Sequence, residues 1–187
     1  ERVVYLDNNA TTAVAPEVLA AMMPFLTERY GNPSSIHNFG GRVAQAIETA
    51  RAQVAALLGA QATEILFTSC GTESNNAAIF SALHNCPKRR KVVISKVEHP
   101  AVLNVGQELL RRGYRVAEAP VDHAGRLDLE RLRELVDDDT AIVSVMWANN
   151  ETGNLYPVEE VAALAHAHGA LFHTDAVQAV GKVPMAL

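Results

Sequence analysis

Cysteine is scarce in this sequence of 187 residues, which contains only Cys70 and Cys86. So few thiols argue against a disulfide-stapled secreted fold and favour a reducing cytoplasm. Long apolar runs are also missing, and none approaches the ~18 consecutive residues that a membrane-spanning helix requires. The opening residues, ERVVYLD, have no signal-peptide or transit-peptide character. We therefore expect a cytoplasmic protein without a membrane partner.

Positive charge is in short supply as well. The 16 lysines and arginines are outnumbered by 21 acidic residues, and the net charge is −5, so no nucleic-acid partner is expected. The basic run KRRK at 88–91 is interpreted as a solvated loop between two regular elements. Neither a Walker loop nor a GxGxxG fingerprint occurs, which disfavours a generic nucleotide-binding domain. No metal site is predicted.

Short apolar runs alternate with longer helical patterns along the chain. The runs have the near-continuous hydrophobicity of strands buried on both faces, and they lie at 64–69, 91–97, 114–121, 141–148 and 170–174. Apolar residues at helical spacing predict helices at 41–58 (ending at Gly59), 101–112, 128–136 and 158–168. This rhythm predicts an α/β fold with a mainly parallel sheet flanked by helices. Ligands of such sheets bind beyond the carboxyl ends of the strands.

The turn after the first run, TSCGTESNN at 68–76, is rich in small and hydroxyl side chains and leads into a helix. Free backbone N–H groups and the positive end of a helix dipole suit a phosphate at such a place. An ordinary helix cap, with Glu73 in the first turn, is the alternative.

Polar side chains follow three further strands. His99, after the second run, can stack on a flat ring and move protons, or simply cap the next helix. Asn149 and Asn150 follow the fourth run, either as a plain turn or as donors to a ligand substituent. Asp175 follows the last run. A carboxylate buried there needs a partner, such as a cationic ring nitrogen. The alternative is that Asp175 caps a helix. Together the four strand ends offer a phosphate cradle, a ring, amides and a carboxylate.

These segments resemble the fold-type I enzymes that use pyridoxal 5′-phosphate (PLP), specifically the NifS/IscS cysteine desulfurases. The sequence around Cys70 is more similar to the NifS branch than to the IscS branch. The resembling blocks are LDNNATT (6–12), GNPSS (31–35), FTSCGTESN (67–75), VEHP (97–100), VMWANNETG (145–153), HTDAVQ (173–178) and AVGKVP (179–184). The resemblance implies the large domain of that fold, incomplete in this chain. Residues 1–14 are expected to form an N-terminal arm and 15–187 part of the PLP-binding domain.

The resemblance also implies a role for each site residue. The cofactor-binding set, in chain order, is Gly71, Thr72, His99, Asn150, Asp175 and Gln178. The first two are expected to hold the cofactor phosphate, and the two amides to bond the ring hydroxyl O3′. Asp175 is expected to pair with the pyridinium nitrogen. His99 is the expected catalytic residue, which stacks on the ring and assists proton transfer.

The implied activity is the PLP-dependent removal of sulfur from L-cysteine, which gives L-alanine and an enzyme-bound persulfide for iron–sulfur cluster assembly. The implied partners are an iron–sulfur scaffold or other sulfur-acceptor protein and a second copy in a homodimer. Members of the family carry a Schiff-base lysine and a sulfur-accepting cysteine in later segments. None of the four lysines matches the first, and Cys70 does not match the second.

The isolated chain is therefore expected to be inactive and to fold poorly alone, because its sheet would keep an unpaired edge. Two alternatives stay open: another fold-type I enzyme, such as a selenocysteine lyase or an aminotransferase, and a non-catalytic fragment. A nucleophilic role for Cys70, whose thiol lies beside a helix N-terminus, is a further possibility from the residues alone.

Overall fold

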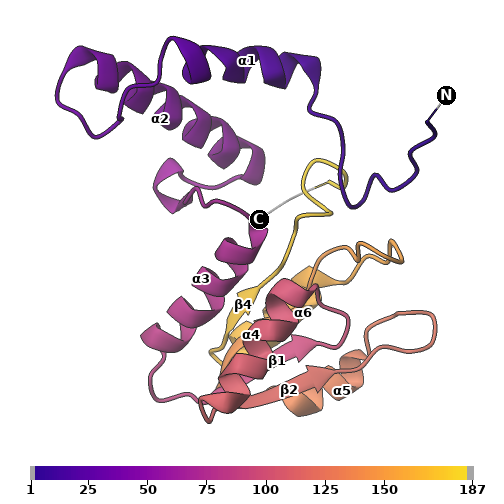
Figure 1. Cartoon of the computed structure of the whole chain (residues 1–187). Helices are drawn as coiled ribbons and strands as arrows, with labels where there is room; N and C mark the ends of the chain where they lie inside the picture. The colour runs from indigo at the N-terminus through magenta and orange to yellow at the C-terminus, as the bar shows by residue number, and fades with distance from the viewer. Residues whose placement is uncertain (1–2, 185–187) are drawn as a thin grey trace. The chain divides into compact units, whose positions relative to one another are not determined.

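The computed structural model describes residues 3–184. The chain forms two compact units, of which the first extends up to Phe67 and includes Pro184, and the second is Thr68–Val183. Figure 1 shows the elements of both units. All of the predicted site residues belong to the second unit. Among the described residues, no helix combines the length and the apolar character needed to cross a membrane.

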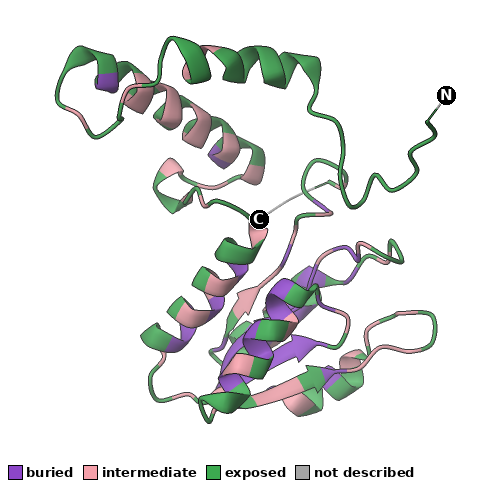
Figure 2. Ribbon diagram, viewed as in Figure 1, coloured by how far each residue is buried: buried purple, intermediate pink, exposed green. Residues whose placement is uncertain are grey.

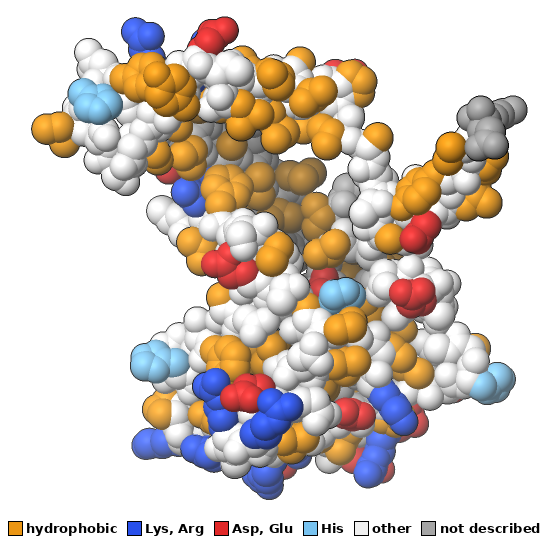
Figure 3. Space-filling model, in the orientation of Figure 1, with side chains coloured by type: hydrophobic (Ala, Val, Ile, Leu, Met, Phe, Trp, Pro, Cys, Tyr) orange, Lys and Arg blue, Asp and Glu red, His pale blue; other side chains and the backbone are white. Residues whose placement is uncertain are grey.

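The first unit is helical, with α1 at Pro16–Thr27, α2 at Asn38–Leu58 and a short 3-10 helix, η1, at Ala62–Glu64. None of the residues of α1 is buried. Its large apolar side chains are exposed, as the hydrophobic atoms over this helix in Figure 3 illustrate: Val18, Leu19, Met22, Met23 and Leu26. A continuous exposed apolar face of this kind is typical of an interaction surface.

Helix α2 begins three residues before the predicted start, at Asn38. The reason is a cap that the apolar spacing does not reveal: the His37 ring accepts a hydrogen bond from the Gly40 backbone N–H at 3.2 Å. The end of the helix is as predicted, because Gly59 forms the C-cap in the left-handed region at φ 70°.

The predicted strand at 64–69 is wrong. Residues 62–64 form η1, and 65–69 adopt no regular structure. Leu66 is 77% exposed, and Phe67 lies beneath the Arg51 guanidinium, 5.0 Å from the ring centroid. The same guanidinium donates to the Ile65 carbonyl. An apolar run becomes a strand only where another strand accepts its hydrogen bonds, and no strand pairs with this run among residues 3–184.

The second unit is an α/β layer structure, as predicted. Its sheet is parallel, in the order β2-β1-β3-β4. The strands are β1 Lys91–Ser95, β2 Arg115–Ala119, β3 Thr140–Ser144 and β4 Leu171–His173, all inside the predicted runs or within one residue of them. The helices are α3 Gly71–Asn85, α4 Pro100–Arg111, α5 Leu129–Leu135 and α6 Val158–Ala167. The predicted fold class is thus confirmed.

The helices cover both faces of the sheet, and the side chains of each strand alternate between two cores. Val93 and Val143 pack with Leu132 of α5 and Val161 of α6. Their neighbours along the strands pack on the other face with α3 and α4, in a cluster that includes Val92, Ile94, Ile142, Ile79, Val102 and Leu109. The two central strands, β1 and β3, are buried along nearly their whole length, and Figure 2 shows buried strand segments between the helices. Because both faces are covered, the carboxyl ends of the strands are where a ligand can reach the sheet.

The basic run at 88–91 is only partly the solvated loop that the sequence suggested. Lys88 and Arg90 are exposed. Arg89, in contrast, is half-buried and donates to the carbonyl groups of Thr140 at 2.6 Å and His168 at 3.0 Å. It therefore ties the start of β3 to the end of α6, a role that the spacing of charges could not show.

Candidate functional site

Asp175 is buried just beyond β4, with 8% of its surface exposed. Its Oδ2 accepts a hydrogen bond from Asn75 Nδ2 of α3 at 2.8 Å, and its Oδ1 accepts from the Val177 backbone N–H at 3.1 Å. No salt bridge to Asp175 forms within the described part of the chain. A buried carboxylate needs compensation, and the two hydrogen bonds leave acceptor positions for a further donor. The expected alternative, a cap on a following helix, is not what forms, since residues 177–182 are turns.

The start of α3 lies beside this carboxylate. The first hydrogen bond of the helix runs from the Ser74 N–H to the Cys70 carbonyl at 3.1 Å, so the preceding N–H groups have no partner within the helix. A Cβ added at Gly71 would lie 3.3 Å from Val177 Cγ2, so glycine lets the helix start approach the turn at 175–178. The positive end of a 15-residue helix is thereby placed near Asp175.

Cys70 occupies the N-cap of α3 and is exposed. The backbone N–H of Glu73, the Ser69 hydroxyl and the Thr72 N–H lower the pKa of its thiol, although burial and the charge of Glu73 oppose this. Glu73 itself accepts from the Ser69 backbone N–H at 2.7 Å and from the Ser69 hydroxyl at 2.6 Å, and these bonds lower the pKa of its carboxyl. The predicted acidic residue is present in the first turn, but the N-cap residue Cys70 makes no side-chain cap hydrogen bond.

His99 is the N-cap of α4, where its Nδ1 accepts from the Ala101 N–H at 3.1 Å. The alternative of a capping histidine is therefore what the structure shows. Because Nδ1 is an acceptor, the proton of the neutral ring lies on Nε2. The residue is exposed, so the cap leaves the ring face and Nε2 accessible, and it is compatible with the predicted stacking role.

Glu98, the neighbour of His99, points the other way and is 4% exposed. Its Oε1 accepts from the Met146 backbone N–H at 2.7 Å and lies 2.5 Å from Ser95 Oγ. Its Oε2 is buried with no hydrogen-bond partner. Burial raises the pKa of Glu98 to about 7, and the negative charge of Asp175 adds to the effect.

Of the two asparagines after β3, Asn149 is buried and Asn150 is only half-buried. Asn149 is buried; its Nδ2 donates to the Val97 carbonyl at 3.1 Å, and its Oδ1 accepts from the Glu151 and Thr152 N–H groups. It orders the loop rather than offering a donor to a ligand. Asn150 is half-buried and donates to Glu151 Oε1 at 2.7 Å.

Gln178 is half-buried in the turn that follows Asp175. Its Oε1 accepts from Lys182 Nζ at 2.7 Å. The turn begins with the Asp175 carboxylate, which accepts the Val177 N–H, so Gln178 and the carboxylate belong to one short segment. The predicted pair Asp175 and Gln178 is thus held by a single local structure.

Backbone contacts join these segments at one edge of the sheet. The Trp147 N–H donates to the Asp175 carbonyl at 3.0 Å and extends the pairing of β3 with β4 beyond the last strand residues. Met146, next to it, is bonded to Glu98. The helix start at Gly71, the turns that carry His99 and Asp175 and the segment before Asn150 are therefore linked by direct contacts.

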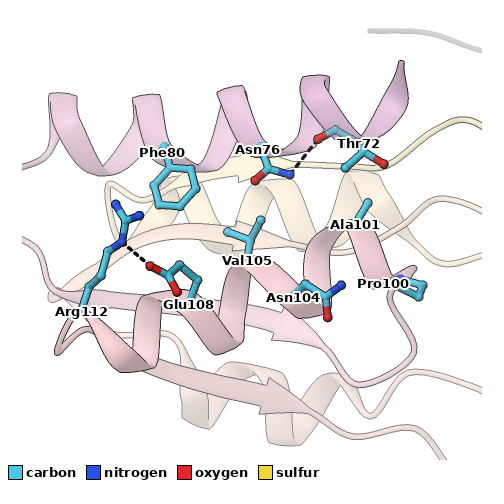
Figure 4. A pocket seen from close by; sticks show the side chains of 9 residues that line it. All are labelled: Thr72, Asn76, Phe80, Pro100, Ala101, Asn104, Val105, Glu108 and Arg112. Carbon is cyan, nitrogen blue, oxygen red and sulfur yellow. Dashed lines mark hydrogen bonds and ion pairs between the residues drawn. The ribbon is translucent and has the colours of Figure 1, made fainter. Parts of the chain in front are cut away.

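A groove of about 350 Å³ lies between α3 and α4 (Figure 4). Its lining includes Thr72, Asn76, Phe80, Asn104, Glu108 and Arg112. Asn76 donates to the Thr72 carbonyl at 2.8 Å, and Glu108 pairs with Arg112 at 2.8 Å. Of the predicted site residues, Thr72 alone lines this groove. It belongs to the outer surface of the two helices and not to the cluster around Asp175.

Sequence reasoning missed Asn75 and Glu98 as members of the site. Asn75 lies one helical turn before Ile79 on the buried face of α3, and an amide on an apolar face is a signal that could have been read. Glu98 follows a run of buried strand residues, and this position is the signal in the sequence that indicates its burial.

The cluster fits PLP. A flat cationic heterocycle would supply the positive charge that the buried Asp175 lacks within the described residues, and the start of α3 suits its phosphate. Gly71 lets the start of α3 lie close to the turn that carries Asp175, and His99 is exposed at the same edge of the sheet.

Comparison with known proteins agrees with this reading. The family described as aminotransferase class-V matches residues 4–187. The cysteine desulfurase NifS of Azotobacter vinelandii is 60% identical over 185 residues, which cover 98% of this chain and 46% of that protein. A solved NifS-like protein superposes with a TM-score of 0.94 at 44% identity, over 98% of this chain and 51% of that one. SspA in complex with cysteine gives 0.92 at 33% identity, over 97% and 52%.

These matches confirm the resemblance to the NifS-type proteins and the fold class. The chain spans about half the length of the curated relatives it matches.

Proposed function

Since this chain belongs to the aminotransferase class-V family, whose members and NifS relatives depend on PLP, we propose that it is the cofactor-binding half of a cysteine desulfurase. The relatives that match it at 54–60% identity are named cysteine desulfurases. The observation that carries the proposal is Asp175, a buried carboxylate with two hydrogen bonds and no salt bridge within the described residues. It needs a cation, and a protonated pyridine nitrogen is one.

In this proposal Asp175 holds the proton on the pyridine nitrogen, and Asn75 fixes the orientation of the carboxylate through its bond to Oδ2. The N–H groups at Gly71 and Thr72 bind the phosphate at the positive end of α3. When bound, PLP supplies a ring that withdraws electrons from the substrate carbon. The carboxylate sustains that property because it keeps the ring positively charged.

The remaining predicted residues act on the other parts of the ring. The imidazole of His99 stacks on one face, with Nδ1 held by the cap on α4 and Nε2 left to move a proton. The amides of Asn150 and Gln178 bond the ring hydroxyl O3′. These three residues lie on segments joined to Asp175 by hydrogen bonds or by sequence, which supports their assignment to one pocket.

The proposed reaction moves sulfur from L-cysteine to an enzyme thiol, which becomes a persulfide, and releases L-alanine; the outer sulfur of the persulfide then passes to an iron–sulfur scaffold or other sulfur-acceptor protein. A homodimer and a cytoplasmic location belong to the same proposal. The names of the relatives and the solved complex of SspA with cysteine support the substrate. The exposed apolar face of α1 is consistent with association. The lysine that binds the cofactor and the cysteine that carries the sulfur are not assigned to this sequence.

The test is Asp175→Ala in a full-length protein that includes this chain, reconstituted with PLP, with Asp138→Ala as the matched control because the side chain of Asp138 is 98% exposed. A lost charge-assisted bond of about 1.5–3 kcal/mol corresponds to a PLP dissociation constant raised roughly tenfold to a hundredfold. Alanine formation from cysteine should almost disappear, while circular dichroism stays unchanged. A D175A variant that binds PLP and releases alanine like the wild type would refute the assignment.

A further inference from the structure

Glu98 joins two segments of the candidate site, the turn that carries His99 and the segment that leads to Asn150. The residue lies in the turn between β1 and α4, and its Oε1 accepts the Met146 N–H beyond β3 at 2.7 Å. A second bond runs in parallel, from Asn149 Nδ2 to the Val97 carbonyl at 3.1 Å. The turn that presents His99 is therefore fastened to the segment that leads to Asn150.

The two oxygens of Glu98 have unequal surroundings. Oε1 has the Met146 N–H and the Ser95 hydroxyl as partners, whereas Oε2 is buried with none. No salt bridge neutralises the group within the described residues. An unpaired ionised oxygen in an apolar interior costs far more than an unpaired hydroxyl, so the geometry favours a proton on Oε2.

The titratable groups around Glu98 reinforce this state. Asp175 is a second buried carboxylate whose charge acts on Glu98, and Tyr156 is a buried phenol. Burial lowers the pKa of His173, which makes a 2.8 Å bond with Ser144 Oγ and so supplies no compensating cation. On the turn of Glu98 itself, Lys96 is exposed, like His99.

We propose that Glu98 is a positioning residue whose protonated, neutral form clamps the His99 turn to the segment that carries Asn149 and Asn150. The clamp itself requires no cofactor. Its consequence for the site rests on the proposed function, because it assumes that His99 and Asn150 contact PLP. Ionisation of Glu98 would leave a buried charge in the clamp and loosen both contacts.

The clamp is tested without cofactor, by denaturation of wild type, Glu98→Gln and Glu98→Ala at several pH values, followed by the fluorescence of the single tryptophan, Trp147. E98Q keeps a neutral acceptor for the Met146 N–H. The wild type should lose stability relative to E98Q as pH rises toward about 7 and show a constant gap above it. E98A, which removes the acceptor, should be less stable than E98Q throughout. Parallel curves for wild type and E98Q would overturn the proposal.

Glu118→Gln is the matched control, because Glu118 is an exposed glutamate on β2. This variant should keep the pH profile of the wild type. A change equal to that of E98Q would show that any removed negative charge has the effect and would also overturn the proposal.

The consequence for the site is tested by the PLP dissociation constants of wild type and E98Q. Their ratio should be near 1 at pH 6 and rise several-fold at pH 8.5, where only the wild type carries the buried charge. A ratio that stays constant with pH would overturn the positioning role. Failure of both proteins to bind PLP, with the difference in stability profiles intact, would instead refute the proposed function and support the clamp.

Discussion

The bond between Asn75 and Asp175 should be among the strongest single side-chain contacts of the second unit. Both residues are more than nine-tenths buried, and Asn75 Nδ2 lies 2.8 Å from Asp175 Oδ2. A hydrogen bond to a charged group contributes about 1.5–3 kcal/mol, and its loss leaves a buried carboxylate oxygen unsatisfied. Asn75→Ala regains about 0.5 kcal/mol of helix propensity. We therefore expect N75A to lower the free energy of unfolding by about 1–3 kcal/mol.

Asn76 is the matched control for this change. It occupies the next position of the same helix, and its Nδ2 donates over the same distance, 2.8 Å, to the exposed backbone carbonyl of Thr72. Asn76→Ala gains the same helix propensity, but water replaces the lost donor. The difference between N75A and N76A therefore isolates the buried bond, and N76A should change the unfolding free energy by less than about 0.5 kcal/mol.

The assay is urea denaturation of the cofactor-free protein at pH 7, followed by the fluorescence of Trp147, whose backbone N–H bonds the Asp175 carbonyl. Cofactor is left out because its binding would add stability of its own. A double-mutant cycle of N75A with D175A should give a coupling energy of about 1.5–3 kcal/mol. A coupling below about 0.5 kcal/mol, or equal losses in N75A and N76A, would refute the reasoning.

Two further predictions use neighbouring residues as their own controls. Gly40→Ala places a Cβ 2.3 Å from the Asn32 carbonyl, whereas Gly41→Ala meets nothing within 4 Å. Urea denaturation of the first unit should show a loss of about 1–3 kcal/mol for G40A and a gain of about 0.5–1 kcal/mol for G41A; similar values for both would contradict the packing. Arg89→Met removes the donor to two backbone carbonyls and should lower the melting temperature by several degrees. Arg90→Met, at an exposed position, should change the melting temperature little. A larger decrease for R90M than for R89M would contradict the role given to Arg89.

The strands and helices of the second unit could be predicted because their signals are local. Strand β1 is a run of β-branched residues, and α4 starts at Pro100 and carries apolar side chains at helical spacing. The run at 64–69 has a similar composition and is not a strand, since pairing depends on a partner distant in the sequence. The apolar composition of this run indicated neither burial, since Leu66 is exposed, nor a ladder of hydrogen bonds, which requires a partner strand.

The candidate site divides in the same way. The positions of His99 and Asp175 follow from the rule that ligands bind at the carboxyl ends of parallel strands, and the structure places both there. The contact that orients Asp175 comes from Asn75, 100 residues away in the sequence. Such a contact is set by how α3 packs on the sheet, so no local pattern predicts it. The resemblance to the desulfurases named residues expected to face the cofactor and did not indicate the residues that hold them in place.

The two buried carboxylates at this edge of the sheet, Asp175 and Glu98, are stabilised in different ways. Asp175 accepts a hydrogen bond on each of its two oxygens, one from Asn75 and one from the Val177 N–H. Glu98 has donors on one oxygen alone, and its pKa is raised from 4.5 to about 7. Because the folded state holds this proton more tightly than the unfolded chain, its stabilising effect is complete below pH 4.5 and disappears as pH rises through about 7. At about 1.4 kcal/mol per pH unit, the loss is about 3 kcal/mol. A second negative charge beside Asp175 is thus avoided in acidic solution, and its appearance as pH rises toward about 7 lowers the stability of the fold.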